Sequence, residues 1–419
     1  MDEERRSARR PDDLAGAIGE RAGAASSPAQ PTIVVGATEQ PGGPLSFPMW
    51  CEQSRDYVVI VADGLPDLRD VSPSSVLDGR RALAVTTPTV DRLHGEGLRR
   101  WLSRTGMDAL VEVMALDERR KTMETALEVA ACAQRHDLGR RDVIIAFGGG
   151  VCSDVVSVAA SLTRRGIAHI TVPTTLVGQV DAGIGLKGGV NFGERKNYLG
   201  CFSPPESALI VPSYLRSLPE RELRCGVAEV MKMALIRDRD LFDVLRADGP
   251  ELIASAFASP PHVARYVIGR SIQLMLEELA SNSYEDRTLR RLVDFGHTFS
   301  STLEERSAYR LKHGEAVAID MALTCEIGGR LGILGRGELD DTLEAFELLG
   351  LPRWSPLCTS DAVAHAIDVT VAHRGGRLNL VVPATIGAGT FVEEARDVPA
   401  SVIASAIGAL ASQADDALA

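Results

Sequence analysis

Short apolar runs alternate with segments of helical periodicity through the first half of the chain, and this alternation constrains its fold more than any other feature. The clearest run, residues 142–147, leads straight into three glycines, Gly148 to Gly150. Such runs are typical of strands buried on both faces of a sheet. Strands alternating with helices predict an α/β domain built on a mostly parallel sheet. The predicted strands cover residues 57–62, 82–86, 109–115, 142–147 and 169–172, and the predicted helices cover 122–134 and 154–165.

The pattern changes near residues 213–220, beyond which helical periodicity dominates. We therefore predict a Rossmann-like parallel-sheet domain over residues 46–216, followed by a mainly α-helical domain over residues 217–400. The predicted helices cover 221–237, 240–246, 263–279, 298–305, 315–331 and 338–349, and a late strand covers 378–382. Residues 1–45 have the composition of a disordered tail, and residues 401–419 form a C-terminal tail or helix.

Charge and cysteine content exclude several classes of protein. The 419 residues carry 45 basic and 57 acidic side chains, a net charge of −12, which disfavours nucleic acid and anionic membranes as partners. The seven cysteines are scattered without a C-x-x-C pair, as expected for a reducing cytoplasm. Neither a run of eighteen apolar residues nor a signal peptide is found, so we expect a cytoplasmic protein.

The glycine turn after the clearest strand is the first candidate site. Gly148 to Gly150 follow a strand and open a helix that contains Asp154. Glycines allow a pyrophosphate to approach the backbone closely, and a helix N-terminus favours its charge. A plain tight turn is the alternative, because the motif is neither G-x-G-x-x-G nor a Walker A loop. Asp63, at the end of the first strand, is a candidate for hydrogen bonds to a ribose.

A second candidate region follows the strand at 169–172. Thr174 and Thr175 lie where ligand crevices occur in parallel sheets, although ordinary turn chemistry would also explain them. The glycine-rich segment 178–197 then supplies charged and amide side chains on closely approachable backbone. These are Asp181, Lys187, Asn191, Lys196 and Asn197. The lysines would form the basic pocket that an acidic protein needs to bind a phosphate.

Two histidines and a glutamate suggest a metal site. His297 lies in the segment 294–304, and His313 follows sixteen residues later; each has glycine neighbours and stands near the start of a predicted helix. Glu229 precedes His297 by sixty-eight residues and has Lys232 one turn after it. Two imidazoles and one carboxylate are typical of a catalytic divalent-metal site with an open position. Taken alone, Glu229 is also an ordinary acidic residue near a helix start.

These segments together resemble one known family. The motifs GGGVCSD, VPTTL, VDAGIGLKGGVN, KN, AEVMK, DFGHTF and HGEAVAIDM occur in an order and spacing similar to those of the dehydroquinate synthase-like sugar phosphate cyclases. The resemblance spans residues 55 to 385. It implies an NAD-binding α/β domain, a helical domain, a zinc-type metal ion with Co2+ as the alternative, a sugar phosphate substrate and a homodimer.

The resemblance assigns roles motif by motif. The metal ligands would be Glu229, His297 and His313. The residues implied to bind NAD are Asp63, Glu118, Lys121, Gly149, Gly150, Asp154, Thr174, Thr175, Asp181, Lys187, Lys196 and Asn197. The residues implied to act on the substrate are Asp181, Lys187, Lys232, Arg290 and Asp294, with Lys196 and Asn197 beside them.

Departures from the dehydroquinate synthase pattern indicate the branch. That pattern has Asn where Asp294 stands, His where Ser301 stands, and DKK where residues 372–374 read Ala-His-Arg. Asp294, Leu279 and His373 resemble the branch that cyclises sedoheptulose 7-phosphate to 2-epi-5-epi-valiolone. That branch usually has Pro at the position of Ser301 and Thr at the position of Gly188, so 2-epi-valiolone stays open as the product.

The resemblance implies a reaction with no net redox change. A hydroxyl is oxidised by NAD, phosphate is eliminated, the hydride returns, and the opened ring closes by an aldol step. Because Ser301 replaces an imidazole, we expect a neutral substrate rather than a carboxylated one. A 3-dehydroquinate synthase, a metal-dependent polyol dehydrogenase and a non-catalytic binding protein are the alternatives.

Overall fold

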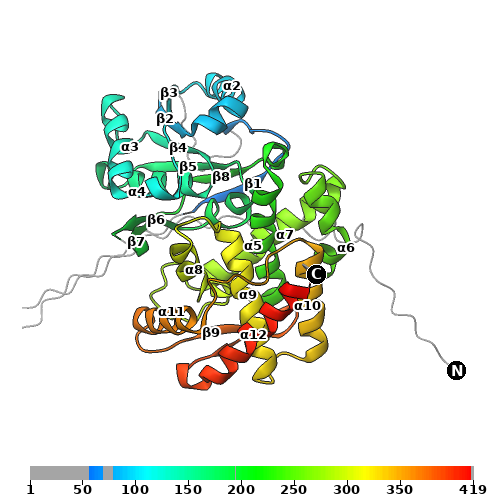
Figure 1. The fold of residues 1–419 in the computed structure, drawn as a ribbon. Helices are drawn as coiled ribbons and strands as arrows, with labels where there is room; N and C mark the ends of the chain where they lie inside the picture. Colours follow the sequence, from blue (N-terminus) through cyan, green and yellow to red (C-terminus); the bar gives the residue numbers. More distant parts are fainter. Residues whose placement is uncertain (1–55, 69–78, 194, 417–419) are drawn as a thin grey trace, which may run out of the picture. The chain divides into compact units, whose positions relative to one another are not determined.

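A six-stranded parallel sheet forms the first half of the protein in the computed structural model, which describes residues 56–68, 79–193 and 195–416 (Figure 1). The predicted tail at residues 1–45 lies outside this description. The sheet order is β1-β8-β5-β4-β2-β3, and every recorded pairing is parallel. The strands are β1 (Val58–Val61), β2 (Arg81–Thr86), β3 (Asp108–Val113), β4 (Val143–Gly148), β5 (Ala168–Pro173) and β8 (Ser207–Ile210). The predicted α/β class is confirmed.

Helices cover both faces of the sheet. Alternate residues of β2 and β4 enter two different hydrophobic clusters, because successive side chains of a strand point to opposite faces. On one face they pack against α3 (Met123–Arg135) and α4 (Gly150–Leu162), and on the other against α2 (Pro88–Thr105). The chain pattern did not predict α2, although Thr87 caps it and Pro88 begins it.

The glycine-rich segment after β5, for which no secondary structure was predicted, is regularly folded. It forms a short π-helix, Gly178–Ala182, and then an antiparallel hairpin of β6 (Lys187–Phe192) and β7 (Arg195–Phe202). The hairpin packs closely on α4: a Cβ atom at Gly188 would lie 2.6 Å from Ser157 Oγ and 3.1 Å from the Val158 nitrogen. Gly188 therefore permits a close approach between hairpin and helix.

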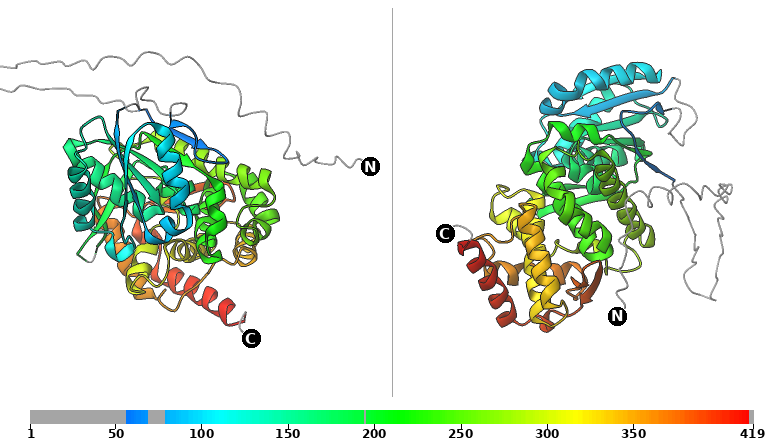
Figure 2. Two further views of the ribbon diagram at one scale, coloured as in Figure 1. Left: turned by 90° about the horizontal axis from the view of Figure 1, so that it is seen from above. Right: turned by 90° about the vertical axis from the view of Figure 1, so that its right-hand side faces the viewer.

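The second half of the chain is mainly helical, as predicted (Figure 2). Its helices are α5 (Glu220–Arg237), α6 (Arg239–Ala254), α7 (Pro261–Ser281), α8 (Ser300–Arg306), α9 (His313–Arg330), α10 (Arg336–Leu348), α11 (Ser360–His373) and α12 (Ala400–Asp416). Two further strands, β9 (Leu380–Thr385) and β10 (Ala388–Val392), pair antiparallel. The helix α11 and the strand β10 were not predicted, whereas α12 lies where a C-terminal tail or helix was expected. From Tyr57 on the chain forms one compact unit, so the domain boundary at residues 216 and 217 stays a prediction.

Helices α5 and α9 run through the core of this half, and α8 is tied to α9 by a buried carboxylate. Asp320 of α9 accepts hydrogen bonds from the backbone nitrogens of Phe299 (2.5 Å) and Ser300 (2.9 Å), and from the Thr324 hydroxyl (3.1 Å). The first backbone N–H groups of a helix have no partner within it, and Asp320 supplies one for the start of α8. This contact fixes the segment that directly follows His297.

Replacing Asp320 with alanine should destabilise the protein by about 3 kcal/mol, because two buried backbone N–H groups would lose their acceptor. Asp320→Asn keeps one acceptor oxygen and should cost less. Urea unfolding of both variants measures the difference. An Asp320→Ala protein as stable as the parent would show that α8 does not depend on this contact.

Candidate metal centre and active site

Three segments far apart in the sequence bring Glu229, His297 and His313 together. Glu229 lies on α5, His297 lies in the turn before α8, and His313 is the first residue of α9. One ligand atom from each lies within 4.8 Å of the others, and His313 Nε2 is 3.2 Å from Glu229 Oε1. The two imidazole centroids are 5.3 Å apart. This donor set and spacing fit a divalent ion such as Zn2+.

Both histidines are oriented through Nδ1. His297 Nδ1 is 3.0 Å from the carbonyl oxygen of Phe295, and His313 Nδ1 is 3.0 Å from Glu304 Oε1. A histidine that donates its Nδ1–H to such an acceptor keeps Nε2 available for a metal. The sequence analysis did not predict Glu304 as a site residue. Its position seven residues after His297 is the sequence feature that could have suggested it.

The Glu229 carboxylate is suited to hold a cation. It is 1% exposed, and neither of its oxygens has a hydrogen bond of good geometry from a described residue. Lys232 Nζ lies 2.8 Å from Oε2, and 3.6 Å from an oxygen of Asp181. Burial opposes ionisation, but Lys232 and His313 hold the pKa of Glu229 well below its usual range. An ionised, buried carboxylate with open acceptor positions fits a metal ligand.

The two histidines differ in charge. Burial and nearby Lys232 lower the pKa of His297 to about 4, so its imidazole is neutral and ready to bind a metal. Burial would also lower the pKa of His313, but Glu304 outweighs it and raises that pKa to about 9. A metal ion at His313 must therefore displace a proton.

Asp294 is bound by two arginines. Arg374 Nη2 lies 2.9 Å from Asp294 Oδ2, and Arg291 Nε lies 3.3 Å from the same oxygen. Burial opposes ionisation of Asp294, yet Arg291 and Arg374 lower its pKa. Arg374 also donates to the carbonyl oxygens of Leu378 (2.8 Å) and Asn379 (3.0 Å), which fixes its position. The sequence prediction named neither arginine.

Arg290, which the resemblance implies to act on the substrate, contacts residues on and just after β10. Its guanidinium lies 3.2 Å from Glu393 and 4.7 Å from the ring centroid of Phe391 on β10. The neighbouring Arg291 is the one that reaches Asp294, and it also contacts Glu285. Two adjacent arginines cannot be distinguished by motif position alone, and the role of Arg290 stays a prediction.

Two lysines of the hairpin lie close to acidic groups. Lys196 Nζ is 2.5 Å from Glu304 Oε2, and both side chains are buried. Lys187 contacts Glu285, and its side chain is 48% exposed. Partial burial of Lys187 together with nearby Arg291 lowers its pKa to about 8. Lys187 is therefore the more accessible cation of the two.

The glycine turn after β4 has the features of a phosphate-binding site. Gly149 precedes α4 without a side-chain cap, which leaves the first N–H groups of this helix available to an anion. Added Cβ atoms would lie 3.1 Å from Thr175 Cγ2 at Gly149 and 3.2 Å from Ala182 Cβ at Gly150. The Thr174 nitrogen donates to the Gly148 oxygen (2.9 Å), which joins the ends of β4 and β5.

Four other residues predicted to bind NAD lie on or beside these elements. Lys121 Nζ is 2.7 Å from Asn197 Oδ1 and contacts Asp154 on α4. Glu118 Oε1 accepts from Asn191 Nδ2 at 3.1 Å. These contacts connect the segment after β3 with the β6–β7 hairpin and the start of α4. Their roles toward a nucleotide stay predictions.

Asp63 is separated from the glycine turn. Asp63 follows the edge strand β1, whereas the glycine turn follows β4. Because β8 and β5 lie between these two strands, β1 and β4 are about 14 Å apart. The Asp63 carboxylate is fully exposed, and Arg265 lies 4.0 Å away. Thr86, which was not predicted, lies at the end of β2, next to β4. Its buried hydroxyl has no hydrogen-bond partner among the described residues, so it is better placed than Asp63 to hydrogen-bond a nucleotide.

The residues used to choose the branch are dispersed. Ser301 is exposed on α8, four residues after His297. His373 ends α11 and is exposed, whereas its neighbour Arg374 contacts Asp294. Leu279 packs against the helical core. The structure gives these residues positions but not roles.

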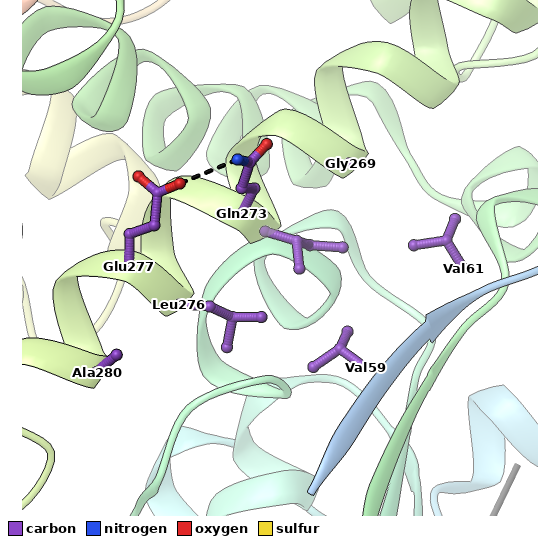
Figure 3. A pocket seen from close by; sticks show the side chains of 8 residues that line it. Val59, Val61, Gly269, Gln273, Leu276, Glu277 and Ala280 are labelled. Carbon is purple, nitrogen blue, oxygen red and sulfur yellow. Dashed lines mark hydrogen bonds between the residues drawn. The ribbon is translucent and has the colours of Figure 1, made fainter. Parts of the chain in front are cut away.

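An open apolar pocket of about 480 Å³ lies away from these residues, between β1 and α7 (Figure 3). Val59 and Val61 line one side, and Ile272, Leu276 and other residues of α7 line the other. No predicted site residue lines this pocket. Within the described part of the chain, no helix is both long and apolar enough to cross a membrane.

Comparison with known proteins agrees with the site geometry. The family descriptions "3-dehydroquinate synthase N-terminal" and "3-dehydroquinate synthase C-terminal" match residues 111–225 and 226–369. The chain is 40% identical over 381 residues to 2-epi-5-epi-valiolone synthase of Streptomyces glaucescens, covering 90% of this chain and 96% of that one. It is 33% identical over 336 residues to 3-dehydroquinate synthase of a Synechococcus strain, covering 80% and 90%.

A solved structure gives the same result. The 2-epi-5-epi-valiolone synthase of Streptomyces hygroscopicus subsp. jinggangensis 5008, with NAD+ and Zn2+ bound, superposes with a TM-score of 0.81 at 40% identity. The match covers 87% of this chain and 99% of that one. The chain therefore belongs to the 3-dehydroquinate synthase-like cyclase family, and it is an enzyme of that family.

Replacing His313 with alanine should abolish stoichiometric zinc binding and turnover, because one of the three metal ligands is lost. The fold should stay intact. Metal content after dialysis and far-UV circular dichroism measure the two effects. A His313→Ala protein that keeps one zinc per chain and full activity would contradict the assignment of this residue as a ligand.

Proposed function

We propose that this enzyme cyclises sedoheptulose 7-phosphate to 2-epi-5-epi-valiolone and releases phosphate, which makes it a phosphate-eliminating carbon–oxygen lyase. The observation that carries the proposal is the cluster of Glu229, His297 and His313 in a chain 40% identical to 2-epi-5-epi-valiolone synthases over most of its length. The glycine turn at α4 supports NAD as the cofactor, and the donor set supports zinc. The expected homodimer and cytoplasmic location stay predictions.

NAD would supply the redox chemistry of the reaction, and a zinc ion would act as a Lewis acid. When bound, NAD would take up a hydride and return it, and a zinc ion held by Glu229, His297 and His313 would acidify the hydroxyl being oxidised, so the cycle would need no external oxidant. The protein side chains must then bind the sugar phosphate, orient its hydroxyls, and hold protons at the correct atoms.

Lys232 acts as a fixed positive charge rather than as a base. Its Nζ lies between Glu229 (2.8 Å) and Asp181 (3.6 Å) and is 2% exposed. Burial alone would lower its pKa, but Asp181 and Glu229 outweigh burial and raise that pKa. A lysine that stays protonated donates hydrogen bonds to substrate oxygens. Asp181 is less buried than Lys232 and accepts hydrogen bonds from substrate hydroxyls.

Lys187 is the principal candidate to bind the phosphate. Its ammonium group is half exposed, whereas Lys196 is buried against Glu304. Arg291 shares the contact to Glu285 with Lys187, so the two cations lie close together. A pair of cations of this kind suits the charge of a phosphate monoester. Release of phosphate from this site completes the elimination step.

The surroundings of Asp294 favour a neutral sugar over a carboxylated one. Its ionised carboxylate is already bound by Arg291 and Arg374, which leaves less positive charge for a substrate carboxylate. Ser301 stands where a dehydroquinate synthase would offer an imidazole. At position 294, a substrate carboxylate would meet the negative Asp294 in place of the neutral asparagine of the dehydroquinate synthase pattern. Like charges at short range disfavour binding.

The choice of sugar is the direct test. The enzyme should release phosphate from sedoheptulose 7-phosphate and not from the phosphorylated precursor of 3-dehydroquinate, because only the second carries a carboxylate. A phosphate-release assay with both sugars decides between them. Turnover of the carboxylated sugar alone would refute the proposal and favour a 3-dehydroquinate synthase.

Two further outcomes separate the alternatives. A polyol dehydrogenase would accumulate NADH, whereas a cyclase shows no net change in NADH absorbance during phosphate release. The ring stereochemistry, read by NMR of the product, separates 2-epi-5-epi-valiolone from 2-epi-valiolone.

Asp294→Asn should lower kcat/KM for sedoheptulose 7-phosphate by at least about tenfold, because Arg291 and Arg374 would lose their charged partner and shift. Zinc content should not change, since Asp294 is not a ligand. Steady-state kinetics and metal analysis of the same preparation measure both. Unchanged kinetics would show that the charge of Asp294 does not contribute to turnover of sedoheptulose 7-phosphate.

A further inference from the structure

Glu304 is a buried carboxylate that none of the predicted roles requires. It lies on α8 with its side chain 3% exposed, and it contacts two groups of the site at once. Oε1 is 3.0 Å from His313 Nδ1, and Oε2 is 2.5 Å from Lys196 Nζ. A buried charge is retained only where partners compensate for its desolvation, and here both partners belong to other elements.

The contact with His313 determines which ring nitrogen faces the cluster. His313 Nε2 lies 3.2 Å from Glu229 Oε1, on the opposite side of the ring from Glu304. His297 is oriented in the same manner by the carbonyl oxygen of Phe295, which belongs to the backbone of its own turn. His313 begins α9 and relies instead on a side chain from α8. Of the two histidine ligands, His313 is therefore the one whose orientation a side-chain substitution outside the cluster can release.

The contact with Lys196 connects the same carboxylate to the first half of the chain. Lys196 lies on β7, and the next residue, Asn197, accepts a hydrogen bond from Lys121. Lys121 in turn contacts Asp154 at the start of α4. A continuous series of polar contacts thus runs from the glycine turn region to His313, and Glu304 is the member that joins the hairpin to the metal cluster.

We propose that Glu304 is a positioning residue for the metal centre, holding His313 with Nε2 toward Glu229 while anchoring Lys196 of the hairpin. The inference rests on the metal site of the proposed function, but not on the identity of the sugar. A purely structural ion pair with Lys196 is the competing explanation. That explanation requires Glu304 and Lys196 variants to behave alike, whereas positioning requires that only Glu304 variants weaken metal binding.

Zinc affinity of the full-length protein, measured by competition with a chromophoric chelator after metal removal, distinguishes the two. Glu304→Ala should weaken zinc binding by about 10- to 100-fold. Glu304→Gln should have a smaller effect, because an amide oxygen still accepts from His313 Nδ1–H but without a negative charge. Lys196→Met should leave zinc affinity at the parent value, since the contact between Glu304 and His313 persists.

Glu326→Gln is the matched control. Glu326 is equally buried and ion-paired, with Arg330, and it lies on the same helix as His313, about 20 Å along it. The zinc affinity of the Glu326→Gln protein should equal that of the parent. Thermal unfolding of each metal-free variant checks the fold; if Glu304→Ala does not fold, the nearly isosteric Glu304→Gln carries the test.

Parent-like zinc affinity in folded Glu304 variants would overturn the inference, and so would equal losses in the Glu304 and Lys196 variants. A parent protein that binds no zinc would overturn the metal site itself and this inference with it. Failure to turn over sedoheptulose 7-phosphate, with the zinc results as expected, would refute only the proposed substrate.

Discussion

The ionised carboxylate of Glu229, buried in the middle of α5, is the constraint on which the site depends. A charge in that position is unfavourable unless cations surround it. Lys232 provides one from the same helix, one turn away, and the two histidines direct nitrogen atoms toward the space that remains. The fold must therefore bring the turn before α8 and the start of α9 against α5. Asp320 of α9 joins the first two of these segments by accepting hydrogen bonds from the backbone of residues 299 and 300.

Local pattern was sufficient for much of the fold. The strands β2, β4 and β5 and the helices α5, α7 and α9 were predicted because each has an unbroken apolar period and clear ends. Strand β8 has only four residues, and its pairing with both β1 and β5 is a tertiary fact that no local pattern contains. The hairpin of β6 and β7 was missed because glycine and charged residues have low strand propensity, and its stability comes from packing on α4.

The candidate site, like the fold, could be predicted only in part from the sequence. The motifs indicated the metal cluster, and the fold brings its three members together. They could not show that Glu304 and Arg374 reach the site, since Glu304 lies on α8 and Arg374 directly follows α11, and packing sets the orientation of both helices. They also could not distinguish Arg290 from Arg291. One residue step along an irregular turn decides which guanidinium faces Asp294, and that step depends on the contacts of both side chains.

The close approach at Gly188 bears on any attempt to redesign the product. A threonine there, as the valiolone-forming branch usually has, would place its Cβ atom against Ser157 Oγ and the adjacent backbone of α4. Introducing threonine at 188 therefore requires a smaller residue at 157 or a shift of the hairpin. Since the hairpin also carries Lys187 and Lys196, such a shift would move both cations, so a change at residue 188 must be combined with one at residue 157 if the two lysines are to stay in place.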